Sequence, residues 1–256
     1  MTGDDHMLAR DLAGQAGQRL LELRAQGGDP DVLRKAGDRL SHEFLTAALA
    51  RQRPGDAVLS EEGADNPARL GARRVWIVDP LDGTREFGEP GRTDWAVHVA
   101  LWERVGDGTG QLTAGAVALP AQDTVLSTLE SPAGPGPASA TAPLRIVVSR
   151  SRPPSFVRNI SDLLSAELVS LGSAGAKVAA VINGEVDAYV HGGGFYEWDT
   201  AAPVAVARAA GLHASRIDGS ALAYNQPDLL MPDILVCRPA VAGILLRAIR
   251  EVTHAS

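Results

Sequence analysis

The order of apolar segments along the chain changes near its middle, and this change constrains the fold more than any other feature. Two segments with helical spacing come first, and a run of short segments rich in Val, Trp and Leu follows them. After residue 144, strand-like and helix-like segments alternate. A run of strands predicts one sheet, whereas alternation predicts an α/β arrangement. The expected fold class is therefore α/β (α+β), with an N-terminal subdomain at 1–130 and a C-terminal subdomain at 144–256.

The segment SPAGPGPASATAP, residues 131–143, separates the two patterns. It consists almost entirely of Pro, Gly, Ala and Ser and has no large apolar side chain to bury. This composition is typical of a hinge or a surface loop. We therefore expect the boundary between the subdomains to fall there.

The N-terminal subdomain is expected to begin with two helices. The first covers residues 4–25, with Asp4 or Asp5 as its N-cap, and the second follows Asp38 and ends near Arg51. The strands expected after them are 57–60, 74–78, 94–102, 113–119 and 123–129.

The C-terminal subdomain is expected to alternate between strands and helices. A single cysteine, Cys237, lies in the strand-like run DILVC, where a small buried side chain is expected instead of a reactive thiol. The expected strands are 144–149, 167–171, 186–190 and 233–237, and the expected helices lie near 153–165, 174–183, 199–210 and 240–252.

Charge and hydropathy exclude several classes of partner. With 31 acidic and 24 basic residues, the formal charge of -7 offers no basic surface for nucleic acid or an anionic membrane. No stretch reaches the roughly 18 apolar residues that a membrane span needs, and the N-terminus lacks the apolar core of a signal peptide. We expect a cytoplasmic protein.

The stretch WIVDPLDGT places Asp79 and Asp82 at the end of an apolar strand. Two adjacent carboxylates share either a proton or a cation. Pro80 forces a turn that brings Asp82 back beside Asp79, and the Leu81 carbonyl points the same way. Three such oxygens suit Mg²⁺. The alternative is an Asp-rich turn that caps a helix starting near Thr84.

A phospho-aspartate mechanism is disfavoured by the spacing. Phosphatases of the haloacid dehalogenase type use Asp-x-Asp-x-Thr, whereas this chain has Asp-x-x-Asp-Gly-Thr. The extra residue changes which side chains face one another.

Two further acidic motifs end predicted elements. Glu61 and Glu62 follow the strand-like AVLS, and Asp199 lies in EWDTAA at the start of an apolar helix. Taken singly, the glutamates read as solvated loop charges and Asp199 as an N-cap. Taken together, the three motifs predict a site for two or three metal ions.

SEEGAD, WIVDPLDGT and EWDTAA, in this order, resemble the inositol monophosphatase superfamily of lithium-sensitive, Mg²⁺-dependent phosphatases. The most similar branch is that of the 3'(2'),5'-bisphosphate nucleotidases of sulfur assimilation, the CysQ proteins. The resemblance implies a layered αβαβα sugar-phosphatase fold with the metal site between the subdomains. Homodimers are common in the family, although the sequence itself does not give the oligomeric state.

The resemblance further implies which residues bind two or three Mg²⁺. Glu61 resembles the glutamate that bridges a metal and the attacking water, and Asp79 resembles a bridging carboxylate. Leu81 is expected to ligate through its carbonyl, and Asp82 and Asp199 are expected to bind the second metal.

The remaining catalytic groups implied are Asp38 and Thr84, alongside Glu61. Asp38 resembles an aspartate that hydrogen-bonds the motif threonine and helps to hold a weaker third metal, although it also reads as a helix N-cap. The mechanism implied is direct in-line attack by water, without a covalent intermediate. The Gly83 and Thr84 amides then offer an anion site for the phosphate.

Substrate contacts are less constrained by the sequence. Gly172, Ser173 and Lys177 lie in LGSAGAK, which suits either a ribose or phosphate contact or a simple helix-packing turn. Tyr196 is expected to stack on a base, and Asp199 to contact the substrate. Arg150 and Arg216 are candidate partners for a second phosphate.

The function expected is removal of the 3'-phosphate of adenosine 3',5'-bisphosphate (PAP), with 3'-phosphoadenylyl sulfate as a further candidate substrate. The alternative within the same fold is a phosphatase for inositol 1-phosphate or fructose 1,6-bisphosphate. An alternative of another class is an inactive metal or nucleotide sensor.

Overall fold

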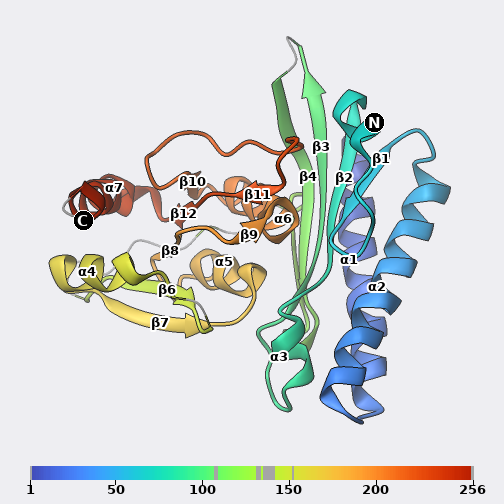
Figure 1. Ribbon diagram of the computed structural model, residues 1–256, viewed down its shortest axis with the longest axis horizontal. Helices are drawn as coiled ribbons and strands as arrows, with labels where there is room; N and C mark the ends of the chain where they lie inside the picture. The colour runs from blue at the N-terminus through green and yellow to red at the C-terminus, as the bar shows by residue number, and fades with distance from the viewer. Residues whose placement is uncertain (1, 107–108, 131–133, 135–141, 152, 255–256) are drawn as a thin grey trace.

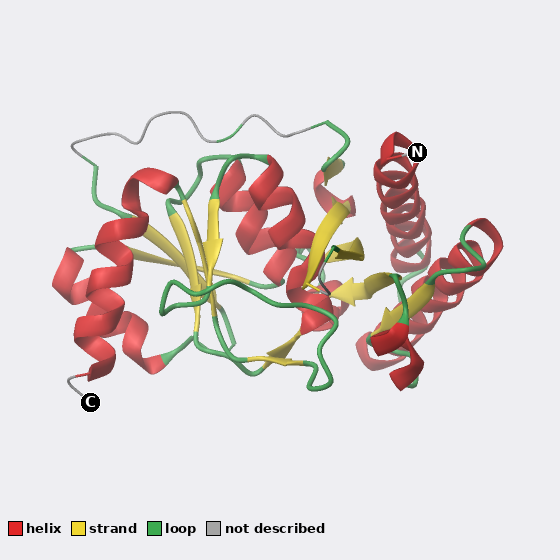
Figure 2. Cartoon of the chain, turned by 90° about the horizontal axis from the view of Figure 1, so that it is seen from above, coloured by secondary structure: helices red, strands yellow, loops and turns green. Residues whose placement is uncertain are grey.

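Five layers of secondary structure make up the computed structural model, which describes residues 2–106, 109–130, 134, 142–151 and 153–254. Helices α1 and α2 cover one face of the N-terminal sheet, and α6 covers the other. Helix α5 packs beside α6 against the C-terminal sheet, whose far face is covered by α4 and α7. Figure 2 shows these layers edge-on. The αβαβα arrangement implied by the resemblance is therefore confirmed.

The first half contains the single sheet that the run of strands predicted. Its five strands have the order β1-β2-β3-β4-β5, with β1 and β2 parallel and the other pairs antiparallel. The elements are α1 (Thr2–Ala25), α2 (Pro30–Gln52), β1 (Ala57–Ser60), η1 (Pro67–Gly71), β2 (Arg74–Asp82), α3 (Thr84–Gly88), β3 (Ala96–Val105), β4 (Thr109–Leu119), η2 (Pro120–Gln122) and β5 (Thr124–Ser127).

The expected start of the second helix was wrong. Helix α2 begins at Pro30, whose fixed φ suits the first helical position. The Asp29 Oδ1 atom caps it by accepting hydrogen bonds from the backbone N–H groups of Asp31 and Val32. Asp38 therefore lies inside the helix and is not an N-cap.

The expected cap of the first helix was also wrong. Helix α1 begins at Thr2, upstream of Asp4 and Asp5. Asp5 is buried and forms ion pairs with Arg53 (2.8 Å) and Arg74 (3.1 Å). It ties the helix to the sheet instead of capping it.

The second half alternates between strands and helices, as predicted. Its sheet has the order β10-β12-β8-β6-β7, in which β6 is parallel to β7 and β8, and β12 is antiparallel to β8 and β10. The elements are β6 (Arg145–Ser149), α4 (Ser155–Leu164), β7 (Glu167–Leu171), α5 (Ala174–Ile182), β8 (Ala188–His191), β9 (Phe195–Tyr196), α6 (Glu197–Ala209), β10 (His213–Ser215), β11 (Leu230–Met231), β12 (Ile234–Cys237) and α7 (Pro239–His254).

Three short strands, β9, β10 and β11, were missed by the sequence prediction, because two or three residues carry no measurable alternation. Most of the segment 131–143 lies outside the described residues, so the boundary between subdomains stays a prediction. Cys237 is fully buried, as expected, and its burial raises the pKa of the thiol to about 12.

Small residues let helix α6 lie close to the N-terminal sheet. Gly115 of β4 faces the helix, and a Cβ atom there would come within 2.7 Å of the Ala205 Cβ atom. Ala201 and Ala202 are likewise buried at this contact. Figure 1 shows α6 beside the N-terminal sheet, and this packing brings Asp199, in the first turn of the helix, close to Asp79 and Asp82 of β2.

Candidate active site

The acidic motifs of the N-terminal half meet at the carboxyl ends of two parallel strands. Ser60 of β1 pairs with Val78 of β2, so the next residues, Glu61 and Asp79, lie side by side at this end of the sheet. Parallel strands bring their carboxyl ends to one edge, where α/β proteins commonly assemble sites. Glu61 and Asp79 both line a cavity of about 250 Å³.

A break in the strand pairing brings Asp82 beside Asp79. Strand β2 pairs with β3 at Asp79 and again at Asp82, with a register shift between them. Pro80 lies in this interval and has no backbone N–H to donate to the sheet. The Asp79 Oδ1 atom accepts a hydrogen bond from the Leu81 N–H at 3.0 Å, which holds the turn. The structure therefore brings the two carboxylates together as the spacing predicted.

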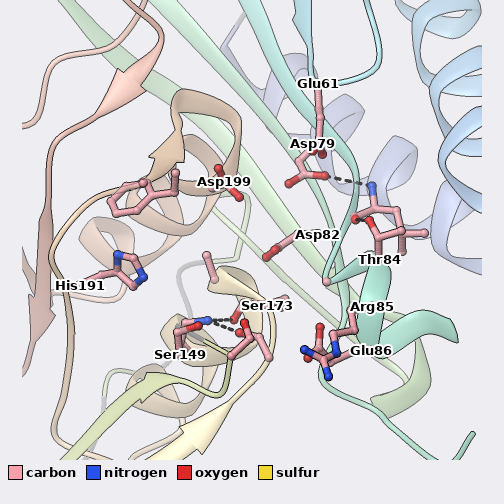
Figure 3. Close-up of a pocket in the computed structure, with 18 of the residues that line it drawn as sticks. Glu61, Asp79, Asp82, Thr84, Arg85, Glu86, Ser149, Ser173, His191 and Asp199 are labelled. Carbon is pink, nitrogen blue, oxygen red and sulfur yellow. Dashed lines mark hydrogen bonds between the residues drawn. The ribbon is translucent and has the colours of Figure 1, made fainter. Parts of the chain in front are cut away.

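Asp199 completes this acidic group from the C-terminal half. Its Oδ2 atom accepts a hydrogen bond of 2.6 Å from the Tyr196 N–H, which orients the carboxylate. One carboxylate oxygen from each of Asp79, Asp82 and Asp199 lies within 4.8 Å of the others. Figure 3 shows the three side chains, and Glu61 above them, around one space. Hard oxygen ligands at this spacing fit a divalent cation.

The protonation of these carboxyl groups reflects their crowding. Burial raises the pKa of Asp82 to about 6, and burial with the charge of Asp82 raises the pKa of Asp199 to about 6. Burial and the charge of Glu61 raise the pKa of Asp79 well above its usual range. Glu61 lies in an exposed turn, but desolvation of its carboxyl group and the charge of Asp199 raise its pKa to about 7. A cation would replace these protons.

The predicted pair of Thr84 and Asp38 is present beside this group. The Thr84 hydroxyl lies 3.2 Å from the Asp38 Oδ1 atom and 3.0 Å from the Leu81 carbonyl oxygen, both of which accept. Desolvation, followed by the charge of Glu62, raises the pKa of Asp38 to about 6. Helix α2 thus contributes Asp38 from its middle, in reach of the metal motif.

The sequence prediction missed His98, which lies directly under the site. It is fully buried on β3, with its Nε2 atom 3.2 Å from the Asp82 Oδ2 atom and its Nδ1 atom 3.2 Å from the Trp198 carbonyl oxygen. Burial lowers the pKa of this imidazole to about 4. A polar residue in the otherwise apolar run WAVHVALW was the available signal. The Asp82 Oδ2 atom also accepts from the Gly175 N–H at 2.8 Å.

The turn before helix α5 lines the cavity. Gly172, Ser173 and Lys177 all border it, as do Gly83 and Thr84. The Ser173 Oγ atom caps α5 by accepting from the Ala176 N–H at 2.8 Å. The buried Lys177 donates to the carbonyl oxygens of Gly172 and Ser173, so its ammonium group holds the turn. Burial lowers the pKa of Lys177 to about 8.

Tyr196 does not line the cavity. Consecutive strand residues point to opposite faces, and Phe195 is the residue of β9 that borders the cavity. Tyr196 is 42% exposed, and its ring stacks on Trp198 with a centroid separation of 4.8 Å. Inside the cavity, the rings of His191 and Phe195 meet edge to face at 5.0 Å.

The two candidate arginines are also outside the cavity lining. Arg150 pairs with Glu86 at 2.6 Å and with Glu89 at 3.0 Å. Arg216 forms a two-point pair with Asp233 at 2.8 and 2.7 Å. Both guanidinium groups are therefore committed to carboxylates of the chain.

Fold and site together define a class: a layered αβαβα protein with a group of carboxylates, between its two sheets, that could hold a metal ion. The model of the inositol monophosphatase family matches residues 9–254. The chain belongs to this family. Among the residues that the structure describes, no helix is long and apolar enough to cross a membrane.

Several relatives are similar over nearly the whole chain. A 3'-phosphoadenosine 5'-phosphate phosphatase from Mycobacterium leprae is 53% identical, and the match covers 97% of this chain and 94% of that protein. A 3'(2'),5'-bisphosphate nucleotidase CysQ from Escherichia coli O157:H7 is 30% identical, with 84% and 91% covered. The crystal structure of CysQ from Bacteroides thetaiotaomicron has a TM-score of 0.76 at 30% identity, with 92% and 97% covered.

A second solved structure supports the fold alone. Inositol monophosphatase II from Staphylococcus aureus MSSA476 superimposes with a TM-score of 0.80 over 96% of this chain and 95% of that one. Its sequence identity is 22%.

Proposed function

We propose that this chain is a Mg²⁺-dependent, lithium-sensitive phosphomonoesterase that removes the 3'-phosphate of PAP and releases AMP. The observation that carries the proposal is 53% identity, over 97% of the chain, to a phosphatase named for this substrate. The grouping of Asp79, Asp82 and Asp199 supports it, because phosphoryl transfer needs cations to offset the charge on phosphate. 3'-Phosphoadenylyl sulfate, which carries the same 3'-phosphate, is the further substrate expected.

Two or three Mg²⁺ are proposed to be held by the carboxylates of Glu61, Asp79, Asp82 and Asp199 and by the carbonyl oxygen of Leu81. When bound, Mg²⁺ supplies Lewis acidity, which lowers the pKa of water and stabilises the leaving oxygen. The chain contributes ligands from Glu61, Asp79, Leu81, Asp82 and Asp199.

Thr84 and Asp38 are the pair proposed to move the proton of the attacking water. The Thr84 hydroxyl can donate to Asp38 at 3.2 Å, which leaves an oxygen lone pair free to accept a proton from water. The raised pKa of Asp38, about 6, suits a group that takes a proton near neutral pH. Glu61 is proposed to orient the same water from the opposite side.

The nucleotide is proposed to extend from the carboxylates towards Phe195 and His191. This edge-to-face pair gives the cavity an aromatic wall suited to a flat base or a ribose. The turn formed by Gly172 and Ser173 lies across the same cavity and offers hydroxyl and backbone groups to the sugar or phosphate. This wall replaces the stacking role first expected of Tyr196.

Gly192 argues against an inositol phosphate as the preferred substrate. Inositol-specific relatives resemble one another in having a glutamate at this position, which accepts hydrogen bonds from the ring hydroxyls. Here the position is a glycine, and a Cβ atom on it would lie 2.7 Å from the Phe156 Cε1 atom, so any side chain would have to displace the partly buried Phe156 ring. Loss of a hydrogen bond to a charged group costs about 1.5 to 3 kcal/mol, or about 10- to 150-fold in kcat/KM.

Phosphate release from PAP, inositol 1-phosphate and fructose 1,6-bisphosphate, with Mg²⁺ and with EDTA, tests the proposal. We expect kcat/KM for PAP to exceed that for inositol 1-phosphate by at least about tenfold, and EDTA to abolish turnover. Equal efficiencies would favour the inositol phosphatase. Mg²⁺ binding without phosphate release from any substrate would favour the sensor.

The same proposal includes a cytoplasmic role in sulfur assimilation and a homodimer. Size-exclusion chromatography with light scattering checks the dimer directly.

A further inference from the structure

We propose that Arg69 is a positioning residue that joins the two halves of the metal site and sets how far Glu61 lies from Asp199. The inference rests on the metal site of the proposed function. Arg69 belongs to η1, in the connection between β1 and β2, and therefore to the N-terminal half. Its contacts reach into the C-terminal half.

Arg69 is a charged side chain in an almost fully buried position. The side chain is 1% exposed, and a buried charge is costly unless its donors are paired. Its Nε and Nη2 atoms donate to the two carboxylate oxygens of Asp65, at 2.7 and 3.2 Å. Its Nη1 atom donates to the Asn225 Oδ1 atom at 2.7 Å, and Nη2 also donates to the Gln226 carbonyl at 2.9 Å. One guanidinium thus holds two loops together.

The second loop is held in turn by Glu197 of α6. Glu197 is 1% exposed, and its two carboxylate oxygens accept from the backbone N–H groups of Asn225 and Gln226, each at 2.7 Å. Asn225 has a φ of 58°, a left-handed conformation that needs such support. In Figure 1 the loop that precedes β11 reaches across to the N-terminal sheet.

These contacts join two metal-ligand motifs that come from opposite halves. Asp65 follows Glu61 by four residues in the turn after β1, and Glu197 precedes Asp199 by two residues in the first turn of α6. The path Asp65, Arg69, Asn225 and Glu197 therefore runs from one motif to the other. We name this set of four residues the Arg69 clamp.

The Arg69 clamp is a buried polar network at a position where apolar side chains could give similar stability, and its place between the two motifs suggests a different role. Replacing a buried ion pair by apolar side chains is often neutral for stability, whereas directional hydrogen bonds specify one arrangement. Metal affinity depends on such supporting contacts, and losing one typically weakens it by about 10- to 100-fold. We expect the clamp to act on metal affinity in the same way.

The test compares Arg69→Met with Arg74→Met in the full-length protein. Arg74 is a matched control, because it also pairs with several carboxylates, Asp5, Asp56 and Glu103, but joins only elements of the N-terminal half. Mg²⁺ binding is measured by isothermal titration calorimetry, and Mn²⁺ binding by electron paramagnetic resonance. We expect Arg69→Met to raise both Kd values by about 10- to 100-fold and Arg74→Met to leave them unchanged, although both lower Tm.

Glu197→Gln keeps the size of the side chain but replaces one acceptor oxygen by a donor. We expect Glu197→Gln to raise the Kd for Mg²⁺ as well. The double variant with Arg69→Met should have a Kd no higher than that of the more strongly affected single variant, because both substitutions disrupt the same hydrogen-bond network. A wild-type Kd in folded Arg69→Met overturns the inference. If that variant does not fold, an unchanged Kd in Glu197→Gln overturns it.

The readout separates this inference from the proposed substrate. A wild-type protein that binds Mg²⁺ but does not hydrolyse PAP contradicts the proposed function, while the Kd comparison still decides the role of Arg69. A wild-type protein that binds neither Mg²⁺ nor Mn²⁺ overturns both.

Discussion

The two halves of the molecule contribute to the site in different ways. The N-terminal half places Glu61, Asp79 and Asp82 at the ends of two adjacent strands, within one short stretch of sheet. The C-terminal half contributes one carboxylate, Asp199, and the cavity wall that contains Phe195. The candidate metal ligands thus come mainly from the ends of regular strands, whereas the rest of the cavity wall comes largely from turns and from the short strand β9.

This difference follows from what each task needs. Ligands of a cation must meet within a few ångströms, and strand ends with a fixed register provide such precision. A wall that recognises a nucleotide needs shape and mixed polarity, which turns supply more readily. The halves meet where the Gly175 N–H donates to Asp82 and where the Arg69 clamp crosses between them.

The largest expected effect comes from removing a ligand of the N-terminal half. Asp82→Asn keeps the side-chain volume but removes a ligand charge, so we expect kcat to fall by at least about 100-fold. The Tm measured in EDTA should not fall, because a raised pKa means that the ionised carboxylate destabilises the fold near pH 7.

Asp56→Asn is the control for this variant. Asp56 accepts hydrogen bonds from Arg74 (3.0 Å) and Trp76 (2.8 Å) at the start of β1, away from the cavity. The Asp56→Asn variant should have a lower Tm and an unchanged kcat. Turnover by Asp82→Asn above about a tenth of the wild-type value would contradict the assignment of the ligand.

A smaller but still large effect is expected where the two halves touch. In Gly175→Ala the new methyl group would lie 2.4 Å from the His98 Nε2 atom and 2.9 Å from the Ala96 Cβ atom. We expect this overpacking to destabilise the protein by about 1 to 3 kcal/mol and to lower kcat about tenfold by shifting Asp82. Thermal unfolding and initial rates measure the two effects.

Gly14→Ala provides the comparison. A Cβ atom at Gly14, in α1, meets only the Val125 Cγ2 atom at an ordinary 3.7 Å. This substitution should leave kcat unchanged and raise stability by about 0.5 to 1 kcal/mol, because alanine favours a helix. If both variants behaved alike, the contact between Gly175 and Asp82 would have no special role.

The pH dependence of metal binding gives a third, more moderate effect. In the folded protein the pKa is raised to about 6 for Asp82 and Asp199 and to about 7 for Glu61. The three carboxyl groups therefore stabilise the metal-free fold below about pH 4, and this contribution is lost as the pH rises to about 7. Mg²⁺ must displace the same protons, so its binding strengthens over this range.

Thermal unfolding with Mg²⁺ and with EDTA at pH 5 and pH 8 measures this linkage. At one fixed Mg²⁺ concentration, about 100 times the Kd measured at pH 8, Mg²⁺ should raise Tm by roughly 5 to 10 °C at pH 8 and by less at pH 5, where the Kd is higher. A larger increment at pH 5 would show that the carboxyl groups are not the ligands.

The smallest effect is expected for a residue that the structure places away from the cavity. Arg216→Gln breaks the pair with Asp233 and should cost up to about 1 kcal/mol of stability. The kcat/KM for PAP should stay within about twofold of the wild-type value, since this guanidinium does not line the cavity. A tenfold rise in KM would instead restore Arg216 as a phosphate contact.

Local patterns in the sequence were sufficient for most strands and helices and for the grouping of the acidic residues, whereas the layered αβαβα arrangement was implied by the resemblance to the family. Asp79 and Asp82 lie three residues apart around Pro80, so chain geometry alone brings them together. Most of the predicted strands and helices were confirmed, because the periodicity of apolar residues indicates which face of each element is buried. The errors in secondary structure concerned helix starts, where Asp29 and not Asp38 provides the cap of α2, and the three short strands β9, β10 and β11.

Only the tertiary structure decided which side chains face the site from a distance. Whether Phe195 or Tyr196 borders the cavity depends on the pairing of β9 with β11, two strands too short to read from the sequence. His98 and Arg69 carry no motif. Their positions matter only because folding places the His98 Nε2 atom 3.2 Å from the Asp82 Oδ2 atom and lets Arg69 donate a hydrogen bond to Asn225, both partners being distant in the chain. The sequence by itself determined the ligand motifs, because their geometry is local, while packing of the two halves determined their surroundings.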